Sequence, residues 1–266
     1  MTELTFLKLG GSLITDKTTA YTVRPNKLAA LANELKSVLG RDSNLRLVLG
    51  HGSGSFGHFA VKEHFPRLEI KERADWIGFS EVWYRASQLN RRVMDALHQA
   101  GIPSMAIQPS ASIIAKNGAV EHWELSPLEH ALEVGIVPVI YGDMTFDSVK
   151  GGTVLSTEAL MFHLAHRLKP SRILLAGLED AVWADFPERR QRVGRITPKS
   201  YNALTGKVGG SHGADVTGGM KSKVEEMLRL VEEIPQIAVQ IFSGEEPGNL
   251  EKVLLGEQLG TLIASD

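Results

Sequence analysis

Near the start of the chain, residues 4–12 read LTFLKLGGS, an apolar run of strand length that ends in two glycines and a serine. A strand that runs straight into a glycine turn is typical of α/β sheets that bind ligands at strand ends. A helix is expected next, because Pro25 suits a first helical turn and leucines recur at positions 28, 31, 35 and 39. Gly40 is expected to end this helix as its C′ residue. A second strand is expected at 45–49, and it enters a glycine-rich stretch at 50–57.

The same alternation of short apolar runs and helical patterns continues to the end of the chain. Residues 126–129, SPLE, combine a capping box with a proline in the first helical turn, and that helix is expected to end near Gly135. Further strands are expected at 102–107, 136–141, 172–176, 237–242 and 261–264, and further helices at 76–100, 158–168, 220–234 and 249–255. Strand–helix alternation of this kind predicts an α/β fold with an open, largely parallel sheet and helices on both sides.

Composition excludes several classes of protein. The 266 residues carry 29 Lys and Arg against 31 Asp and Glu, a net charge of −2, which lacks the basic excess of nucleic-acid or anionic-membrane binders. The chain has no cysteine, which excludes disulfides, thiolate metal sites and cysteine nucleophiles and fits a cytoplasmic location. No apolar run approaches the roughly 20 residues of a membrane span, and Lys8 interrupts the N-terminal apolar stretch, so no signal peptide is expected.

Two glycine turns follow the first two expected strands. The first, at 10–12, lies between Lys8 and Lys17, so it pairs accessible backbone amides with positive charge; a plain tight turn is the alternative. The second reads GHGSGSFGH at 50–58, and its glycines leave successive amides free to face phosphate oxygens at the next helix start. It lacks the Lys-Ser/Thr of a Walker A loop and the acidic partner of a dinucleotide fingerprint. His58 closes this loop, where its imidazole can donate a hydrogen bond to a phosphate.

Two further clusters follow later strands. Residues 141–143, YGD, come after the apolar run at 136–141, and residues 156–158, STE, open a helix. Glu158 has two interpretations: it stabilises the helix dipole, or it orients a lysine or holds a magnesium ion. Residues 215–223, DVTGGMKSK, place glycines and lysines at the start of another amphipathic helix, which indicates a third anion site. Residues 187–195 contain four arginines and are interpreted as a solvated loop, with a lid near a nucleotide as the alternative.

Three glycine-rich anion sites with spaced lysines, and no Ser-His-Asp or zinc pattern, point to phosphoryl transfer. In that chemistry the protein mainly positions the reactants and neutralises charge on the moving phosphoryl group, so lysines and backbone amides suffice.

Together these motifs resemble the amino acid kinase superfamily, and the match spans most of the chain. Within it, residues 8–17, KLGGSLITDK, and residues 54–58, GSFGH, look like isopentenyl phosphate kinases. The resemblance implies a three-layer αβα sandwich, a single domain over 1–266, acceptor binding by its N-terminal half and ATP binding by its C-terminal half. It also implies a homodimer.

The resemblance assigns roles to individual residues. It implies catalytic roles for Lys8, Lys17, His58 and Glu158; acceptor binding by Ser53, His58, Gly142 and Asp143; and ATP binding by Lys8, Gly10, Gly11, Ser12, Gly54, Asp180, Gly219 and Lys223. No protein metal ligand is expected.

Three segments depart from the family pattern. Residues 156–159 read STEA where the family commonly has SGDD, so one carboxylate is missing. Residues 178–183 read LEDAVW where the family has DxDGVY, which leaves Asp180 as the matching acid. His51 stands where glycine is commoner. None of these changes removes the lysines or His58, so activity is expected.

The implied reaction uses ATP and Mg²⁺ to convert isopentenyl phosphate to isopentenyl diphosphate. The acceptor is already a phosphate oxyanion, so direct in-line transfer without a general base is expected. Because its tail is apolar, Phe79 or Trp83 on the helix expected at 76–100 are candidates for the pocket wall, with simple core packing as the alternative. The nearest rival function is a fosfomycin or other small phosph(on)ate kinase of the same fold. A second alternative is a non-catalytic nucleotide- or oxyanion-binding protein.

Overall fold

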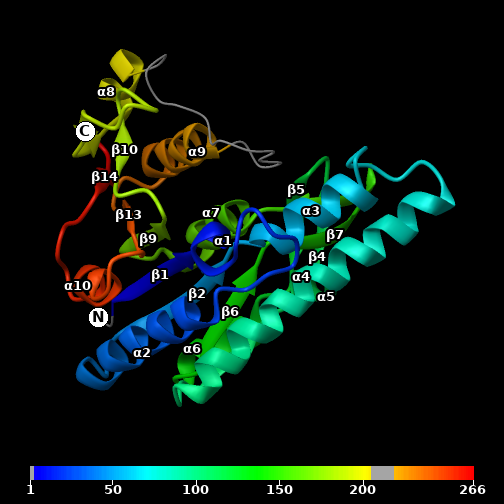
Figure 1. The fold of residues 1–266 in the computed structure, drawn as a ribbon, viewed down its shortest axis with the longest axis horizontal. Coiled ribbons are helices and arrows are strands. Elements are labelled where there is room, and N and C mark those ends of the chain that lie inside the picture. The colour runs from blue at the N-terminus through cyan, green and yellow to red at the C-terminus, as the bar shows by residue number, and fades with distance from the viewer. Residues whose placement is uncertain (1–2, 205–218) are drawn as a thin grey trace.

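A computed structural model describes residues 3–204 and 219–266, and its centre is an eight-stranded sheet (Figure 1). The strand order is β12-β14-β13-β9-β1-β2-β6-β3. The strands are β1 (Leu4–Leu9), β2 (Arg46–His51), β3 (Ser104–Ala106), β6 (Val137–Tyr141), β9 (Arg172–Gly177), β12 (Arg195–Ile196), β13 (Ala238–Ser243) and β14 (Thr261–Ile263). Among these strands only the β13–β14 pair is antiparallel, so the predicted mostly parallel sheet is confirmed.

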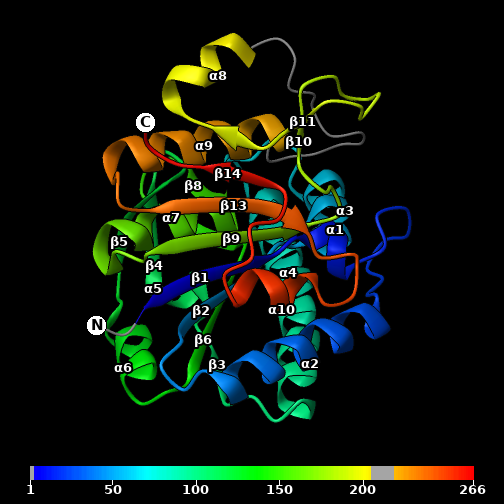
Figure 2. The ribbon, with the colours of Figure 1, turned by 90° about the vertical axis from the view of Figure 1, so that its left-hand side faces the viewer.

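Helices cover both faces of this sheet, as Figure 2 shows. One face packs against α2 (Pro25–Arg41), α4 (Arg73–Gln99) and α10 (Asn249–Leu254), and the other against α6 (Ser126–Glu133), α7 (Thr157–Leu168) and α9 (Gly219–Glu233). Burial of two large apolar clusters against the sheet stabilises the three layers. The αβα sandwich expected from the resemblance is confirmed.

The period of two along β1 decides where its lysine points. Leu7 and Leu9 pack in the cluster with α2, α4 and α10, whereas Phe6 packs in the cluster with α7 and α9. Alternate residues of a strand face opposite sides of the sheet. Lys8 therefore shares the face of Phe6 and points toward α7 and α9.

A second sheet has the strand order β5-β4-β7-β8, and the sequence did not lead us to expect it. It comprises β4 (Ile113–Lys116), β5 (Ala119–Trp123), β7 (Asp143–Asp147) and β8 (Gly151–Leu155). The signal for its first hairpin is present, because Asn117 and Gly118 both have positive φ, 52° and 83°. An Asn-Gly pair between alternating strands is a strong hairpin signal. No element was expected between the strand at 102–107 and the helix that starts at 126.

The remaining elements are short or flank the main sheet. They are α1 (Gly11–Ile14), α3 (Gly54–His64), α5 (Pro109–Ser112), α8 (Pro198–Leu204) and the two-stranded pair β10 (Val182–Trp183) and β11 (Arg192–Val193). Helix α3 packs extensively against α4.

Two local predictions were wrong. Gly40 does not end α2: the helix continues to Arg41, and the capping position falls on Asp42, whose N–H donates to the Val38 carbonyl. The capping box at 126–129 does not form either, because the N-cap of α6 is Leu125 and the Ser126 N–H donates to the Glu124 carboxylate at 2.9 Å. The Glu124 carboxylate, which lies before the helix, thus accepts a helix N–H in place of the expected capping box.

Among the described residues, no helix has the length and apolar character needed to cross a membrane.

Candidate active site

Five neighbouring parallel strands end at one edge of the main sheet. β6, β2, β1, β9 and β13 run in the same direction, so the turns that follow them gather at this edge. From β1 the chain builds the sheet outward in both directions, with β2 on one side and β9 on the other. Ligands of open α/β sheets bind at such a switch point, beyond the carboxyl ends of the strands.

The two predicted glycine turns pack directly against each other at this point. A Cβ on Gly11 would lie 2.2 Å from the Gly54 nitrogen, and a Cβ on Gly54 would lie 2.2 Å from Thr15 Oγ1. Gly54 also has a φ of +50°, which side chains adopt rarely. The Gly10 N–H donates to the Ala176 carbonyl at 2.8 Å and so fixes the first turn to the end of β9. Both turns therefore need glycine for their close contact.

Lys8 and Glu158 form a buried ion pair at this edge. The Lys8 side chain is 8% exposed and the Glu158 side chain 7%, and the lysine ammonium donates to Glu158 Oε1. Glu158 stands in the first turn of α7. The N-cap of this helix is Ser156, whose hydroxyl accepts the Ala159 N–H at 3.0 Å. Lys223 on α9 approaches the same carboxylate oxygen to 3.9 Å. Three charges from three separate elements thus meet on one face of the sheet.

The charges of this group have definite pKa directions. Burial lowers the pKa of Lys8, against the attraction of Glu158. Burial would raise the pKa of Glu158, but Lys8 and Lys223 hold it below its ordinary value, so the carboxylate is ionised at neutral pH. A carboxylate held between two ammonium groups fixes their positions and leaves one net positive charge for an anion.

Glu226 is a fourth charged residue of this group, and the sequence analysis did not identify it. It lies on α9 one turn beyond Lys223. Burial, followed by the negative charge of Glu158, raises its pKa to about 7, while Arg229 and Lys8 oppose the shift. The spacing of Lys223 and Glu226 at i and i+3 was the available signal, because residues three apart share a helix face.

The Glu226→Gln variant is expected to lose the pH dependence of stability that Glu226 causes between about pH 4.5 and pH 7. In the folded state the Glu226 pKa of about 7 exceeds its ordinary value of 4.5, so the proton stabilises the fold below pH 4.5. This stabilisation is lost as the pH rises to 7, by at most about 1.4 kcal/mol per pH unit. Above pH 7 the added negative charge also weakens anion binding at Lys8 and Lys223.

Thermal unfolding and nucleotide affinity between pH 5 and 8 test this expectation. The glutamine variant should have a flatter profile in both measurements than the parent protein. Glu225→Gln is the matched control, because Glu225 is exposed on the same helix and bonds the Tyr201 hydroxyl at 3.0 Å. Identical slopes for parent and Glu226→Gln would refute the assignment.

Lys17 and Asp180 lie on the exposed rim of this edge. Lys17 is exposed. The pKa of Glu179 is lowered chiefly by its hydrogen bonds from Arg189, and the charge of Lys17 adds a smaller contribution. Asp180 is 54% exposed and lies 3.6 Å from Arg192. The structure therefore places Lys17 toward the loop after β9 rather than in the buried charge group, and its contact with a phosphoryl group stays a prediction.

The arginine-rich segment is exposed and carries ion pairs. Residues 187–192 are solvent-facing, as the solvated-loop interpretation expects, and Arg189 binds Glu179 with two contacts at 2.9 and 2.7 Å. The rest of the expected loop at 187–195 is not a loop, because Arg192 belongs to β11 and Arg195 to β12. A role as a lid stays a prediction.

His58 lies in the first turns of α3, one turn before Val61 on the same helix face. Ser53 is the N-cap of this helix, and Gly11 and Gly54 bring the helix start against the turn at 10–12. Val61 belongs to an apolar cluster with Ala60, Phe65, Phe79, Val82 and Met144, formed between α3, α4 and β7. A buried apolar cluster thus begins one turn beyond His58 on α3. A shared phosphate site for His58 and Lys8 stays a prediction.

Gly142 and Asp143 follow β6. The Gly142 N–H donates to the His51 carbonyl at 3.4 Å. Asp143 is buried, and its carboxylate accepts the N–H groups of Ser110 at 3.2 Å and Met144 at 2.9 Å. Burial raises its pKa to about 6, against these donors. These contacts hold α5 to β7, and binding of an acceptor by Asp143 stays a prediction.

His51 occupies the position where glycine is commoner, and it is a neutral core residue. It is buried, its ring stacks on Tyr141 at 5.4 Å, and its nitrogens contact the Gly52 carbonyl at 3.1 Å and the Asn90 amide at 3.2 Å. Burial lowers its pKa to about 4. The partner atoms, the Gly52 carbonyl oxygen and Asn90 Oδ1, are both acceptors, and neutral imidazole donates from only one nitrogen, so the ring donates to one of the two.

The fourth predicted cluster is described only in part. Residues 215–218 lie outside the described residues, whereas Gly219 starts α9 with a φ of +70°. Within residues 3–204 and 219–266, no group of three or more His, Asp or Glu side chains is placed to hold a metal ion.

Comparison with known proteins shows the family of this chain. A family model described as the amino acid kinase family matches residues 3–243. The chain belongs to the amino acid kinase family.

Two curated members of this family are similar over nearly their whole length. The isopentenyl phosphate kinase of Methanothermobacter thermautotrophicus is 35% identical over 265 residues, which is 97% of each chain. The isopentenyl phosphate kinase of Methanocaldococcus jannaschii is 32% identical over 269 residues, 98% of each chain. A solved X-ray structure of isopentenyl phosphate kinase, 33% identical, matches with a TM-score of 0.83 over 98% of this chain and 100% of the other.

Proposed function

We propose that this member of the amino acid kinase family is an ATP-dependent isopentenyl phosphate kinase. The buried group of Lys8, Glu158 and Lys223 beside two interlocked glycine turns carries the proposal. Ammonium groups and backbone amides are what phosphoryl transfer requires of a protein. The names of the relatives support isopentenyl phosphate as the acceptor.

In the proposed reaction, an oxygen of the acceptor's phosphate attacks the γ-phosphorus of ATP in line with the leaving group. The bond between that phosphorus and the β–γ bridging oxygen breaks, and ADP leaves with the electron pair. Lys8 and Lys17 neutralise charge on the moving group, the turns at 10–12 and 54 cradle it, and Gly219 and Lys223 hold the ATP phosphates. The acceptor oxygen is already anionic, so no residue needs to remove a proton.

Mg²⁺ would enter with ATP. Glu158 is occupied by two lysines, and no cluster of carboxylates is available among the described residues, so phosphate oxygens and water would supply most of its ligands. When bound, the ion would offset negative charge on the β- and γ-phosphates.

The strand order is consistent with acceptor binding by the N-terminal half of the chain and ATP binding by the C-terminal half. β2, β6 and His58 lie on one side of β1, where we place the acceptor, and β9, β13 and Asp180 lie on the other side, where we place ATP. Lys8, on β1 between them, would face both.

The apolar tail of the acceptor would extend from His58 over the cluster of Val61, Phe65 and Phe79. Phe79 is 8% exposed, and its ring packs on Gly152 and stacks on Phe146 at 5.2 Å. Trp83 lies at the border of the same cluster.

Shortening Phe79 is expected to admit longer prenyl phosphates. For Phe79→Ala we expect the ratio of kcat/KM for geranyl phosphate to that for isopentenyl phosphate to rise about tenfold or more, since a methylene-sized change in an apolar pocket is worth that much. This ratio does not depend on the fraction of folded enzyme. Trp76→Ala is the control, because Trp76 touches the same ring but is 41% exposed. An unchanged ratio in Phe79→Ala would show that the ring is only core packing.

Release of ADP tests the proposed function directly. Isopentenyl phosphate, dimethylallyl phosphate, fosfomycin and acetylglutamate are offered in parallel with ATP and Mg²⁺. Turnover of the prenyl phosphates alone is expected. Turnover of fosfomycin alone would favour a phosphonate kinase, and nucleotide binding without any turnover would favour a non-catalytic binding protein.

We further propose that the protein is a homodimer, as the resemblance predicts. We also propose that it works in the cytoplasm, which its cysteine-free composition fits. Light scattering of the purified protein should give twice the mass of one 29.0 kDa chain.

A further inference from the structure

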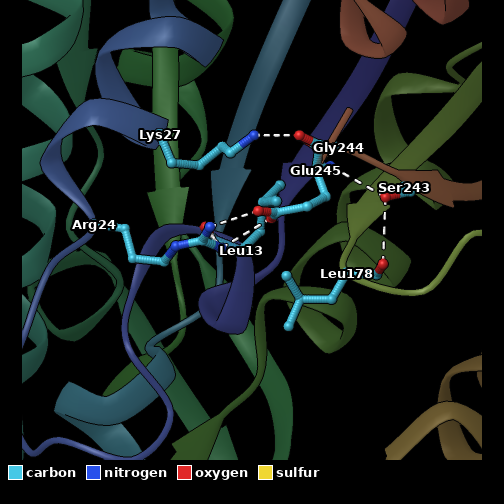
Figure 3. A network of polar contacts seen from close by, with 7 residues as sticks. All are labelled: Leu13, Arg24, Lys27, Leu178, Ser243, Gly244 and Glu245. Atoms are coloured by element: carbon cyan, nitrogen blue, oxygen red, sulfur yellow. Dashed lines mark hydrogen bonds and ion pairs between the residues drawn. The ribbon is translucent and has the colours of Figure 1, made fainter. Parts of the chain in front are cut away.

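A polar network joins the first glycine turn to the C-terminal half of the sheet (Figure 3). Arg24, at the N-cap of α2, binds Glu245 with two contacts, Nη1 to Oε2 at 2.9 Å and Nη2 to Oε1 at 2.5 Å. The same guanidinium donates to the Leu13 carbonyl at 3.1 Å, and the Arg24 N–H donates to the Ile14 carbonyl at 2.8 Å. Arg24 thus donates to the carbonyls of the last two residues of α1.

The network continues to the loop that follows β9. The Glu245 N–H donates to the Ser243 hydroxyl at 3.1 Å, and that hydroxyl donates to the Leu178 carbonyl at 3.3 Å. Leu178 stands two residues before Asp180. Lys27 adds a contact from α2 to the carbonyl of Glu245 and another to Gly244 at 3.4 Å. The network therefore spans from the end of α1, directly after the turn at 10–12, to the proposed nucleotide loop.

Helix α1 depends on such contacts because it has little stability of its own. It has four residues, and no side chain caps its start. A single helical turn is unstable in isolation. Leu13 is fully buried under Gly244, where a Cβ would come within 2.6 Å of Leu13 Cδ2. Side-chain packing and Arg24 together fix where this turn lies.

We infer that Arg24 and Glu245 are positioning residues for phosphoryl transfer: their ion pair sets the turn at 10–12 relative to the nucleotide loop. The inference rests on the proposed function of that turn. Neither side chain needs to touch a substrate. Bidentate arginine–carboxylate pairs have a fixed geometry, which suits them to this task. A displacement of about 1 Å at a reacting centre can lower a rate by about 100-fold.

Steady-state kinetics of Arg24→Gln and Glu245→Gln test the inference. Each variant should lose about 10- to 100-fold in kcat, while KM for ATP and for isopentenyl phosphate changes less than threefold. The double variant should be no slower than the single ones, because both substitutions break the same contact. Arg24→Lys keeps the charge without the fork and should recover part of the loss.

A second ion pair between the same two regions provides the matched control. Arg41, at the other end of α2, binds Glu251 of α10 at 2.6 Å, far along the helix from α1. Arg41→Gln and Glu251→Gln should keep kcat within twofold. Equal losses in the two sets of variants, or unchanged kcat in Arg24→Gln and Glu245→Gln, would overturn the inference.

Amide hydrogen exchange separates this inference from the proposed function. Exchange at residues 13–15 should accelerate at least tenfold in Arg24→Gln and Glu245→Gln but not in the two control variants. This holds even if the parent protein turns over no prenyl phosphate, in which case the proposed function fails alone. Unchanged exchange at 13–15 would show that the ion pair does not hold α1.

Discussion

Replacement of Lys8 by methionine is expected to lower kcat by about 100- to 1,000-fold. A preorganised donor aimed at developing charge is worth this much in enzymes, and Lys8 stands at the switch point of the sheet. Because the change also leaves the buried Glu158 without its closest partner, we expect a loss of about 3 kcal/mol in unfolding free energy.

The double variant Lys8→Met/Glu158→Gln separates catalysis from stability. Removing both charges should restore most of the unfolding free energy, since a neutral pair no longer leaves a buried charge uncompensated. The kcat should stay low, because the ammonium is still missing. Recovery of kcat together with stability would mean that Lys8 acts only as a structural partner of Glu158. Both quantities are obtained from denaturant unfolding and ADP release on the same preparations.

Replacement of His58 by alanine is expected to act on the acceptor rather than on ATP. We expect kcat/KM for isopentenyl phosphate to fall about 10- to 100-fold, the value of one hydrogen bond to a charged group. The dissociation constant of ATP, measured by calorimetry, should change less than threefold. Equal losses for both substrates would refute the role assigned to His58.

A second histidine on the same helix serves as control for this experiment. His64 lies in the last turn of α3, and its Nε2 is 3.6 Å from the neighbouring Glu63. His64→Ala should leave both constants unchanged. His58→Gln keeps an N–H donor, so it should lose less acceptor affinity than His58→Ala.

The parallel sheet was predictable because each of its longer strands is a short, mostly apolar run. β1 has all six residues buried and was placed with its observed bounds, and the strand expected at 136–141 starts one residue before β6 and ends with it at Tyr141. Two glycines with positive φ follow helix ends closely: Gly101 follows α4, which ends at Gln99, and Gly135 follows α6, which ends at Glu133. Gly40 failed as such a signal because it does not take the positive φ that ends a helix at glycine, and α2 continues through it to Arg41.

The pairing of β4 with β7 in the second sheet, and the charge group, needed three-dimensional information. β4 and β5 are short and partly exposed, so their hydrophobic pattern is weak. Sequence placed Lys8, Glu158 and Lys223 at strand and helix ends, but only the fold shows that one carboxylate contacts both lysines. The pKa of Glu226 is raised by burial and by the charge of Glu158, and neither cause can be read from the residues next to Glu226 in the sequence.

The contact of Gly11 with Gly54 limits how members of this family can be recombined. Backbone meets backbone there with no room for a side chain, so the shapes of the two loops must match each other. A chimera that takes residues 1–20 from one homologue and residues 45–60 from another would join surfaces that were selected separately. Exchanging both loops as one unit should preserve solubility and turnover, whereas exchanging either alone should not.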